Sequence, residues 1–145
     1  MAHIERSVLV HYSAEQMYAL VEAVEDYPRF LPWCGGTEVE FRDEHRTRAA
    51  VVISFRGVKQ RFSTDNTKHP PERIEMRLVD GPFKHLDGLW TFTALGPDAC
   101  KVHFRLHYEF SSRLLEKLVG PVFDYIAGSF VDAFSQRADK VYRKA

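Results

Sequence analysis

The sequence has little of what characterises a metal site, a disulfide scaffold or a nucleic-acid coat. Its 145 residues include only two cysteines, Cys34 and Cys100, which stand far apart and form no CxxC pair. The cysteine spacing of a structural zinc site is therefore absent. Lysine and arginine together number 20, as do aspartate and glutamate, so the formal net charge is zero. A protein that mainly coats nucleic acid carries a basic excess, and this class is disfavoured.

Long apolar runs are missing as well. No stretch approaches the ~20 apolar residues that a transmembrane helix needs, and the N-terminus has no apolar leader. Together with the lack of a cysteine pair, this predicts a reducing cytoplasmic setting, with at most peripheral contact at the inner face of the membrane. We expect a single domain over residues 1–145, present as a monomer.

Residues 112–144 carry apolar side chains at steps of three and four, which is the spacing of one face of a helix. Ser112 is suited to cap its start, and the pair Gly120 and Pro121 predicts a kink or a restart. A helix with so wide an apolar face needs a large partner surface in water. We therefore expect this helix to lie across a sheet.

The chain before that helix alternates apolar and polar residues, as strands do. Expected strands cover residues 4–11, 37–42, 46–55, 58–67, 73–79, 86–95 and 100–110. A short helix is expected after Ser13 and another near Pro28. This order predicts an α+β fold, in which a curved antiparallel sheet of about seven strands wraps around the long C-terminal helix, with two short helices after the first strand.

Three stretches resemble a known family. Residues 27–34 read YPRFLPWC, residues 78–92 read LVDGPFKHLDGLWTF, and residues 131–142 read VDAFSQRADKVY. They are similar to motifs of the coenzyme Q-binding protein and ribosome association toxin family, which consists of START-like helix-grip domains in the polyketide cyclase and dehydrase superfamily. The resemblance covers nearly the whole chain and implies the helix-grip form of the fold.

The resemblance implies two functions, and the residues leave both open. The first is non-catalytic binding of ubiquinone, or another hydrophobic small molecule, in support of respiratory electron transport. The alternative is a toxin of a toxin–antitoxin pair, which binds the large ribosomal subunit and blocks its joining with the small one. We expect the first, with ubiquinone as a bound ligand and no separate cofactor.

A cavity between sheet and helix would suit a lipid with a polar head and an apolar tail. The side chains expected to bind it are large and apolar, and they face each other across the two layers: Phe62, Met76, Trp90, Phe92, Phe104, Tyr108, Phe123, Ile126, Phe130 and Phe134. The alternative for each of them is an ordinary place in the packed core.

The proline-bounded stretch after the first helix has two interpretations. Tyr27, Phe30, Leu31 and Trp33 could form a cavity gate or a lip that touches the membrane, since aromatic side chains suit a site with one wet and one apolar side. They could equally form a hydrophobic plug that closes one end of the sheet.

Basic residues gather on the early strands. Arg56, Lys59 and Arg61 are candidates for contact with RNA phosphates. The alternative is a solvated sheet face, with the positive charge balanced by Glu38, Glu40 and Glu44.

Catalytic signals are absent. A cyclase or dehydrase needs an acid or base within hydrogen-bond reach of its substrate, yet the inward strand positions carry no carboxylate pair. No GxSxG, HExxH, P-loop or GxGxxG motif occurs. His103 and His107 share a strand face that alternation predicts to be solvated, and Cys34 reads as a packed thiol. We therefore expect no enzyme activity, no catalytic residues and no metal.

Overall fold

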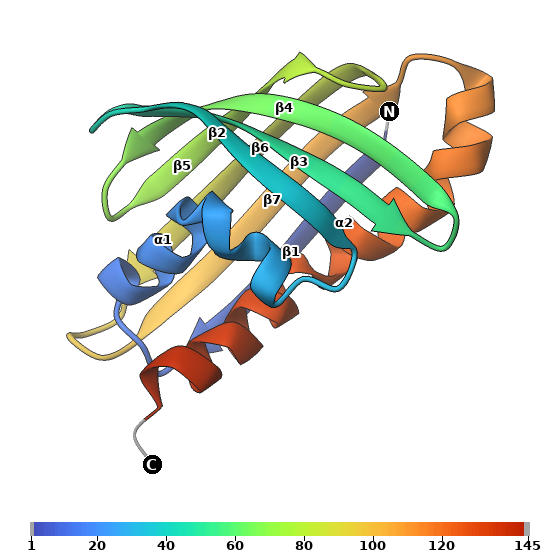
Figure 1. Ribbon diagram of the computed structural model, residues 1–145. Helices are drawn as coiled ribbons and strands as arrows, with labels where there is room; N and C mark the ends of the chain where they lie inside the picture. The colour runs from blue at the N-terminus through green and yellow to red at the C-terminus, as the bar shows by residue number, and fades with distance from the viewer. Residues whose placement is uncertain (1, 144–145) are drawn as a thin grey trace.

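The computed structural model describes residues 2–143 as one curved sheet with helices on its concave side (Figure 1). The strands are β1 (Ala2–Val10), β2 (Cys34–Arg42), β3 (Arg46–Phe55), β4 (Val58–His69), β5 (Arg73–Asp80), β6 (Phe83–Ala94) and β7 (Cys100–Phe110). The helices are α1 (Ala14–Glu22), the 3-10 helix η1 (Val24–Arg29) and α2 (Arg113–Tyr142). This confirms the predicted α+β helix-grip fold.

All neighbouring strands pair antiparallel, in the order β1-β7-β6-β5-β4-β3-β2. Strands β2 to β7 form a simple meander, and β1 joins its far edge beside β7. Figure 1 shows α2 running beneath the sheet, where α1 contacts α2, β6 and β7, while η1 lies against β2 at the other edge. The concave side is therefore closed by helices at more than one place.

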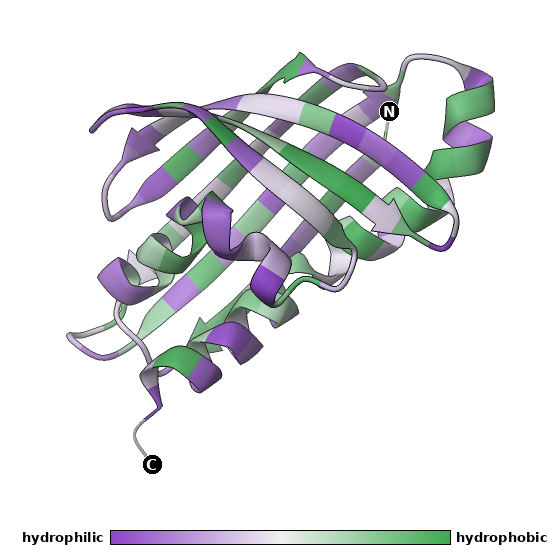
Figure 2. Cartoon of the chain, in the orientation of Figure 1, coloured by the Kyte–Doolittle hydropathy of each residue, from purple (hydrophilic) through white to green (hydrophobic). Residues whose placement is uncertain are grey.

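Strand alternation builds the core. Along β7 the buried side chains occupy every second position, from Cys100 through Phe104 and Tyr108 to Phe110. Figure 2 shows the same alternation of hydrophobic and hydrophilic residues along several strands. The apolar face turns toward the helices and the polar face toward solvent, because successive side chains of a strand point to opposite faces.

Local signals position the helices. The Ser13 hydroxyl accepts from the Gln16 N–H at 3.1 Å, and the Gln16 side chain accepts from the Ser13 N–H at 2.8 Å, so the predicted capping box starts α1. Ser112 caps α2 in the predicted way, accepting from the Leu115 N–H at 3.2 Å. The helix continues through Pro121 without a restart. Its first turns (orange) nevertheless run in a different direction from the rest (Figure 1), as expected of a proline kink.

Two strand boundaries differ from expectation in a way that matters for function. Strand β4 runs to His69, two residues beyond the predicted end, because Lys68 and His69 pair with Ile74 and Arg73 of β5. Strand β2 begins at Cys34 rather than at residue 37, with a bulge before Gly36. The longer β4 places Lys68 on the concave face.

Candidate ligand-binding site

An internal cavity of about 50 Å³ lies between the inner faces of β3, β4 and β5 and the segment from α1 to η1. Its wall is mostly apolar. Three short side chains on the sheet, Thr47, Ala49 and Thr64, face it and are themselves buried. Because short side chains leave room that long ones would fill, the cavity lies where they are grouped.

The size of the cavity limits what it holds in this conformation. A cavity of ~150 Å³ is needed to bind benzene, and a single water takes up ~30 Å³ of the liquid. About 50 Å³ therefore suits water-sized molecules, and a ring with an apolar tail requires side chains to move.

An aromatic pair forms one wall of the cavity. The rings of Trp33 and Phe130 are stacked, with centroids 5.3 Å apart and planes at 20°, and both face the cavity. Trp33 also lines an outer groove of about 630 Å³, together with Phe30, Arg137 and Lys140. A shift of this pair would join the inner cavity to the groove.

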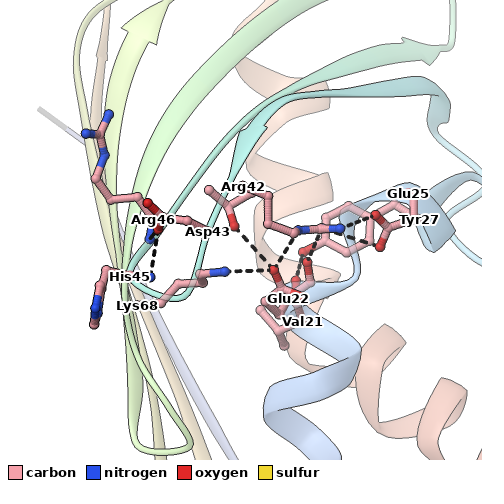
Figure 3. Close-up of polar contacts among 10 residues, drawn as sticks. Val21, Glu22, Glu25, Tyr27, Arg42, Asp43, His45, Arg46 and Lys68 are labelled. Atoms are coloured by element: carbon pink, nitrogen blue, oxygen red, sulfur yellow. Dashed lines mark hydrogen bonds and ion pairs between the residues drawn. The ribbon is translucent and has the colours of Figure 1, made fainter.

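The other end of the cavity is polar (Figure 3). Glu22, at the end of α1, accepts from three donors at one carboxylate oxygen: Lys68 Nζ at 3.2 Å, Thr47 Oγ1 at 3.2 Å and Arg42 Nε at 2.9 Å. Arg42 Nη1 also lies 2.7 Å from Glu25. Two carboxylates therefore balance two cations here, and Lys68, which is only 8% exposed, is the most deeply placed charge.

Unpaired polar groups lie beside this ion pair. The amide oxygen of Asn66 and the hydroxyl of Tyr18 are buried and have no hydrogen-bond partner among residues 2–143. Burial, with a smaller contribution from Glu22, raises the pKa of Tyr18 to about 12. The Tyr27 hydroxyl instead donates to the Val21 carbonyl oxygen, and burial raises its pKa too. Asn66 faces the cavity, whereas Tyr18 does not line it.

The structure brings only part of the predicted ligand set to the cavity. Phe62, Met76, Trp90 and Phe130 line it. The other predicted side chains do not, and they pack in the core instead: Phe92, Phe104, Tyr108, Phe123, Ile126 and Phe134.

Ring packing explains this correction. Phe123 lies 4.8 Å from the ring of Tyr108, and Phe134 lies 5.3 Å from the ring of Trp90, in edge-to-face arrangements. Interlocked rings of this kind fill the interior around these side chains, and a separate hollow of about 260 Å³ lies at the rim between β7 and the first half of α2. The cavity therefore lies closer to β3 and β4 than the sequence suggested.

The predicted lip is mostly buried. Leu31 and Trp33 are 1% and 3% exposed, whereas Tyr27 and Phe30 are half-buried. In this conformation Leu31 and Trp33 cannot touch a membrane, because both are buried and Trp33 stacks on Phe130 of α2. This burial favours the hydrophobic plug for Leu31, and the gate interpretation remains open for Trp33.

Sequence reasoning missed the polar end. Glu22, Thr47, Asn66 and Lys68 all line the cavity, and none was predicted to do so. A signal was present, because Asn66 and Lys68 continue the period of two set by Phe62 on the inner face of β4. Ending the strand at residue 67 hid the place of Lys68.

The three candidate RNA-contact residues are all exposed. Arg61 lies 3.3 Å from Glu38 and 3.5 Å from Glu40, as the charge-balanced alternative expects. Neither Arg56 nor Lys59 has a carboxylate within 4 Å in the part of the chain that the structure describes. Positive charge is thus partly compensated on this face.

The two cysteines are buried, and His103 is paired with a carboxylate. Burial raises the pKa of the Cys34 thiol, which keeps it protonated, and Cys100 is also a buried free thiol. His103 Nε2 lies 2.6 Å from Glu5 on the outer face. Within residues 2–143 no three histidine, cysteine or acidic side chains gather as metal ligands would, and no helix there is long and apolar enough to cross a bilayer.

The chain is similar to a family model and to proteins of known name. A family model described as polyketide cyclase / dehydrase and lipid transport matches residues 10–135. The chain is 46% identical over 142 residues to the ribosome association toxin RatA of Vibrio cholerae, covering 98% of this chain and 99% of that protein.

The chain is also similar to a coenzyme Q-binding protein, and it shares its fold with a solved structure. The chain is 31% identical over 140 residues to coenzyme Q-binding protein COQ10 homolog B, mitochondrial, of Xenopus laevis, covering 94% of this chain and 57% of that longer protein. A START superfamily protein from Mycobacterium smegmatis has the same fold, with a TM-score of 0.73, 22% identity, and coverage of 96% of this chain and 98% of that one.

Proposed function

The chain belongs to the polyketide cyclase/dehydrase and lipid transport family, and from that premise we propose that it binds ubiquinone or a similar isoprenoid lipid without chemical change. The observation that carries the proposal is a mostly apolar cavity with one polar end, which is the usual form of a small-molecule site. No acid–base pair lines the apolar part of that cavity, so binding and carriage fit better than cyclisation or dehydration.

Ligand entry requires the aromatic wall to move. The tail of a lipid contributes ~0.8 kcal/mol for each methylene-sized unit buried, so a tail of several units offsets the loss of one ring contact. Trp33 separates the inner cavity from the outer groove, and Phe130 is its stacking partner. We therefore assign the gate to this pair. Loading from the inner face of a membrane would use the groove. Its lining has a net positive charge, from Arg29, Arg137 and Lys140 against Asp132.

Tryptophan fluorescence tests binding directly, because both tryptophans of the chain, Trp33 and Trp90, line the cavity. A ubiquinone with a ten-carbon tail should quench them saturably. Ala49→Leu fills the cavity and should weaken binding at least tenfold (about 1.4 kcal/mol), with a modest overpacking cost.

Val52→Leu is the matched control, since Val52 lies on the opposite face of the same strand and its change should leave quenching unaltered. Quenching that never saturates, or that Ala49→Leu leaves unchanged, would contradict binding in this cavity.

The gate assignment predicts faster ligand exchange when the stack is weakened. Phe130→Leu removes the ring on which Trp33 stacks and should raise the release rate of the same quinone about tenfold, measured by stopped-flow fluorescence. Phe41→Leu is the control, because Phe41 is exposed on β2 and lines neither the cavity nor the groove. Equal release rates in the two variants would rule out this gate.

A second candidate function is association with the large ribosomal subunit. It is favoured by the 46% identity to a protein named ribosome association toxin, which extends over almost the full length of both chains. One surface feature is compatible with it. The Arg56 guanidinium lies 4.9 Å from the Phe55 ring and 5.0 Å from the Tyr125 ring, and such exposed arginine–aromatic groups suit RNA phosphates and bases.

Replacing Arg56, Lys59 and Arg61 together by alanine should weaken co-sedimentation with isolated large subunits. Because each phosphate contact adds ~0.7–0.9 to the slope of log affinity against log salt, the slope should fall by about 2–3. Arg77→Ala with Arg105→Ala, elsewhere on the outer sheet face, is the control. If the unmutated protein does not sediment with large subunits, this function is excluded.

A further inference from the structure

The polar end of the cavity presents two functional groups from one strand. Asn66 and Lys68 are separated by one residue on β4, so both point to the concave face, about 6.6 Å apart along the strand. Thr47 pairs with Asn66 across β3 and β4, and Met76 pairs with it across β4 and β5. A ligand head that reaches this end therefore meets the amide and the ammonium together.

The amide needs a hydrogen-bond donor. Its oxygen is buried, and no group within residues 2–143 donates to it. The Thr47 hydroxyl, although on the paired residue, donates to Glu22 instead. A buried acceptor without a donor costs free energy, which a ligand O–H would recover.

The ammonium supplies the complementary donor. Lys68 Nζ carries three N–H groups, and Glu22 is the carboxylate that it contacts, at 3.2 Å. Its remaining N–H groups can donate to a ligand oxygen. The site thus combines one free acceptor with free donors.

The charge at this end is already balanced. Glu22 and Glu25 stand against Arg42 and Lys68, all joined by contacts of 2.7 to 3.2 Å. A carboxylate or phosphate head would add a buried negative charge with no cation left to pair with it, and such a charge is costly. An uncharged head is therefore favoured.

We infer that this end of the cavity recognises an uncharged hydroxyl, so that the preferred ligand is a lipid with a hydroxyl-bearing head. A hydroxyl donates to the Asn66 oxygen while it accepts from Lys68, whereas a quinone carbonyl can only accept. For an isoprenoid quinone, the protein selects the hydroquinone form over the quinone. This inference rests on the proposed function, since it assumes that the cavity binds a lipid.

Calorimetric titration under anaerobic conditions tests it, using ten-carbon-tailed ubiquinol, the corresponding ubiquinone, and palmitate. The unmutated protein should bind the quinol at least tenfold more tightly than the quinone, and palmitate more weakly than either. Asn66→Leu should abolish the preference for quinol over quinone and should keep or raise the melting temperature, because it removes the unpaired amide. Thr67→Val should retain the preference, because Thr67 lies between Asn66 and Lys68 but points to the opposite face of β4.

The outcomes are separable. Equal affinity for quinol and quinone, or a preference that survives Asn66→Leu, would overturn the hydroxyl inference while leaving lipid binding intact. Tight palmitate binding would overturn the inference that the site prefers an uncharged head. If the unmutated protein binds none of the three, the proposed function fails and this inference fails with it.

Discussion

Replacing Glu22 with leucine should lower the free energy of unfolding by about 1–3 kcal/mol, because it leaves the buried Lys68 ammonium without the carboxylate that it contacts. Lys68, with a side chain only 7% exposed, would lose the carboxylate at 3.2 Å. Thr47 would lose the acceptor of its hydroxyl at the same time. Arg42 would still contact Glu25, so the charge left without a partner is that of Lys68. Urea denaturation monitored by circular dichroism measures the change.

The paired variant is the control for this result. Glu22→Leu with Lys68→Met removes both charges and should recover most of the lost stability, since apolar replacements of a whole buried pair are often neutral. If the single and paired variants unfold at the same urea concentration, then the two side chains are not energetically coupled, and the polar end is less enclosed than the contacts indicate.

Leu31→Ser with Trp33→Ser should lower the melting temperature sharply. Both side chains are almost fully buried, and truncating such residues costs ~2–5 kcal/mol each. A domain of this kind has ~5–15 kcal/mol of stability in total. The sequence alone also allowed the opposite result, in which the same pair lies on the surface and its loss only slows transfer from membranes.

Pro32→Ser is the matched control, because Pro32 lies between the two and is exposed. It should change the melting temperature little, since surface substitutions mostly stay within ~0.5 kcal/mol and a lost loop proline adds ~0.4–1 kcal/mol. A doubly substituted protein that melts normally but takes quinone from vesicles slowly would contradict the burial and restore the membrane lip.

The fold was predictable because its signals are local and repeated. Alternation along Cys100–Phe110 defines β7 from the sequence alone, and Ser13 with Gln16 marks the start of α1. The kink at Pro121 follows from the chemistry of proline. Each signal depends on a few adjacent residues, so no knowledge of distant contacts was needed.

The site was less predictable because a cavity is what side chains from several elements leave unfilled. An aromatic stripe can line a space, as Phe130 does, or interlock, as Phe123 and Phe134 do. Nothing in their spacing separates the two cases. Lys68 reads as a surface charge until α1 brings Glu22 opposite it, and the sequence separates those two residues by 46 positions.

The placement of β1 beside β7 has a consequence for synthesis. Ala2 is aligned with Tyr108, so the first strand made must wait for the last one. At ~5–20 residues per second, this wait lasts on the order of 5–20 s on a translating ribosome. The meander from β2 to β6 can pair in the meantime. During this time β1 stays unpaired, and the concave sheet face that α2 later covers stays exposed to solvent. Cotranslational folding therefore ends with three additions, β7, β1 and α2, and the protein acquires its interior only as its final helix emerges.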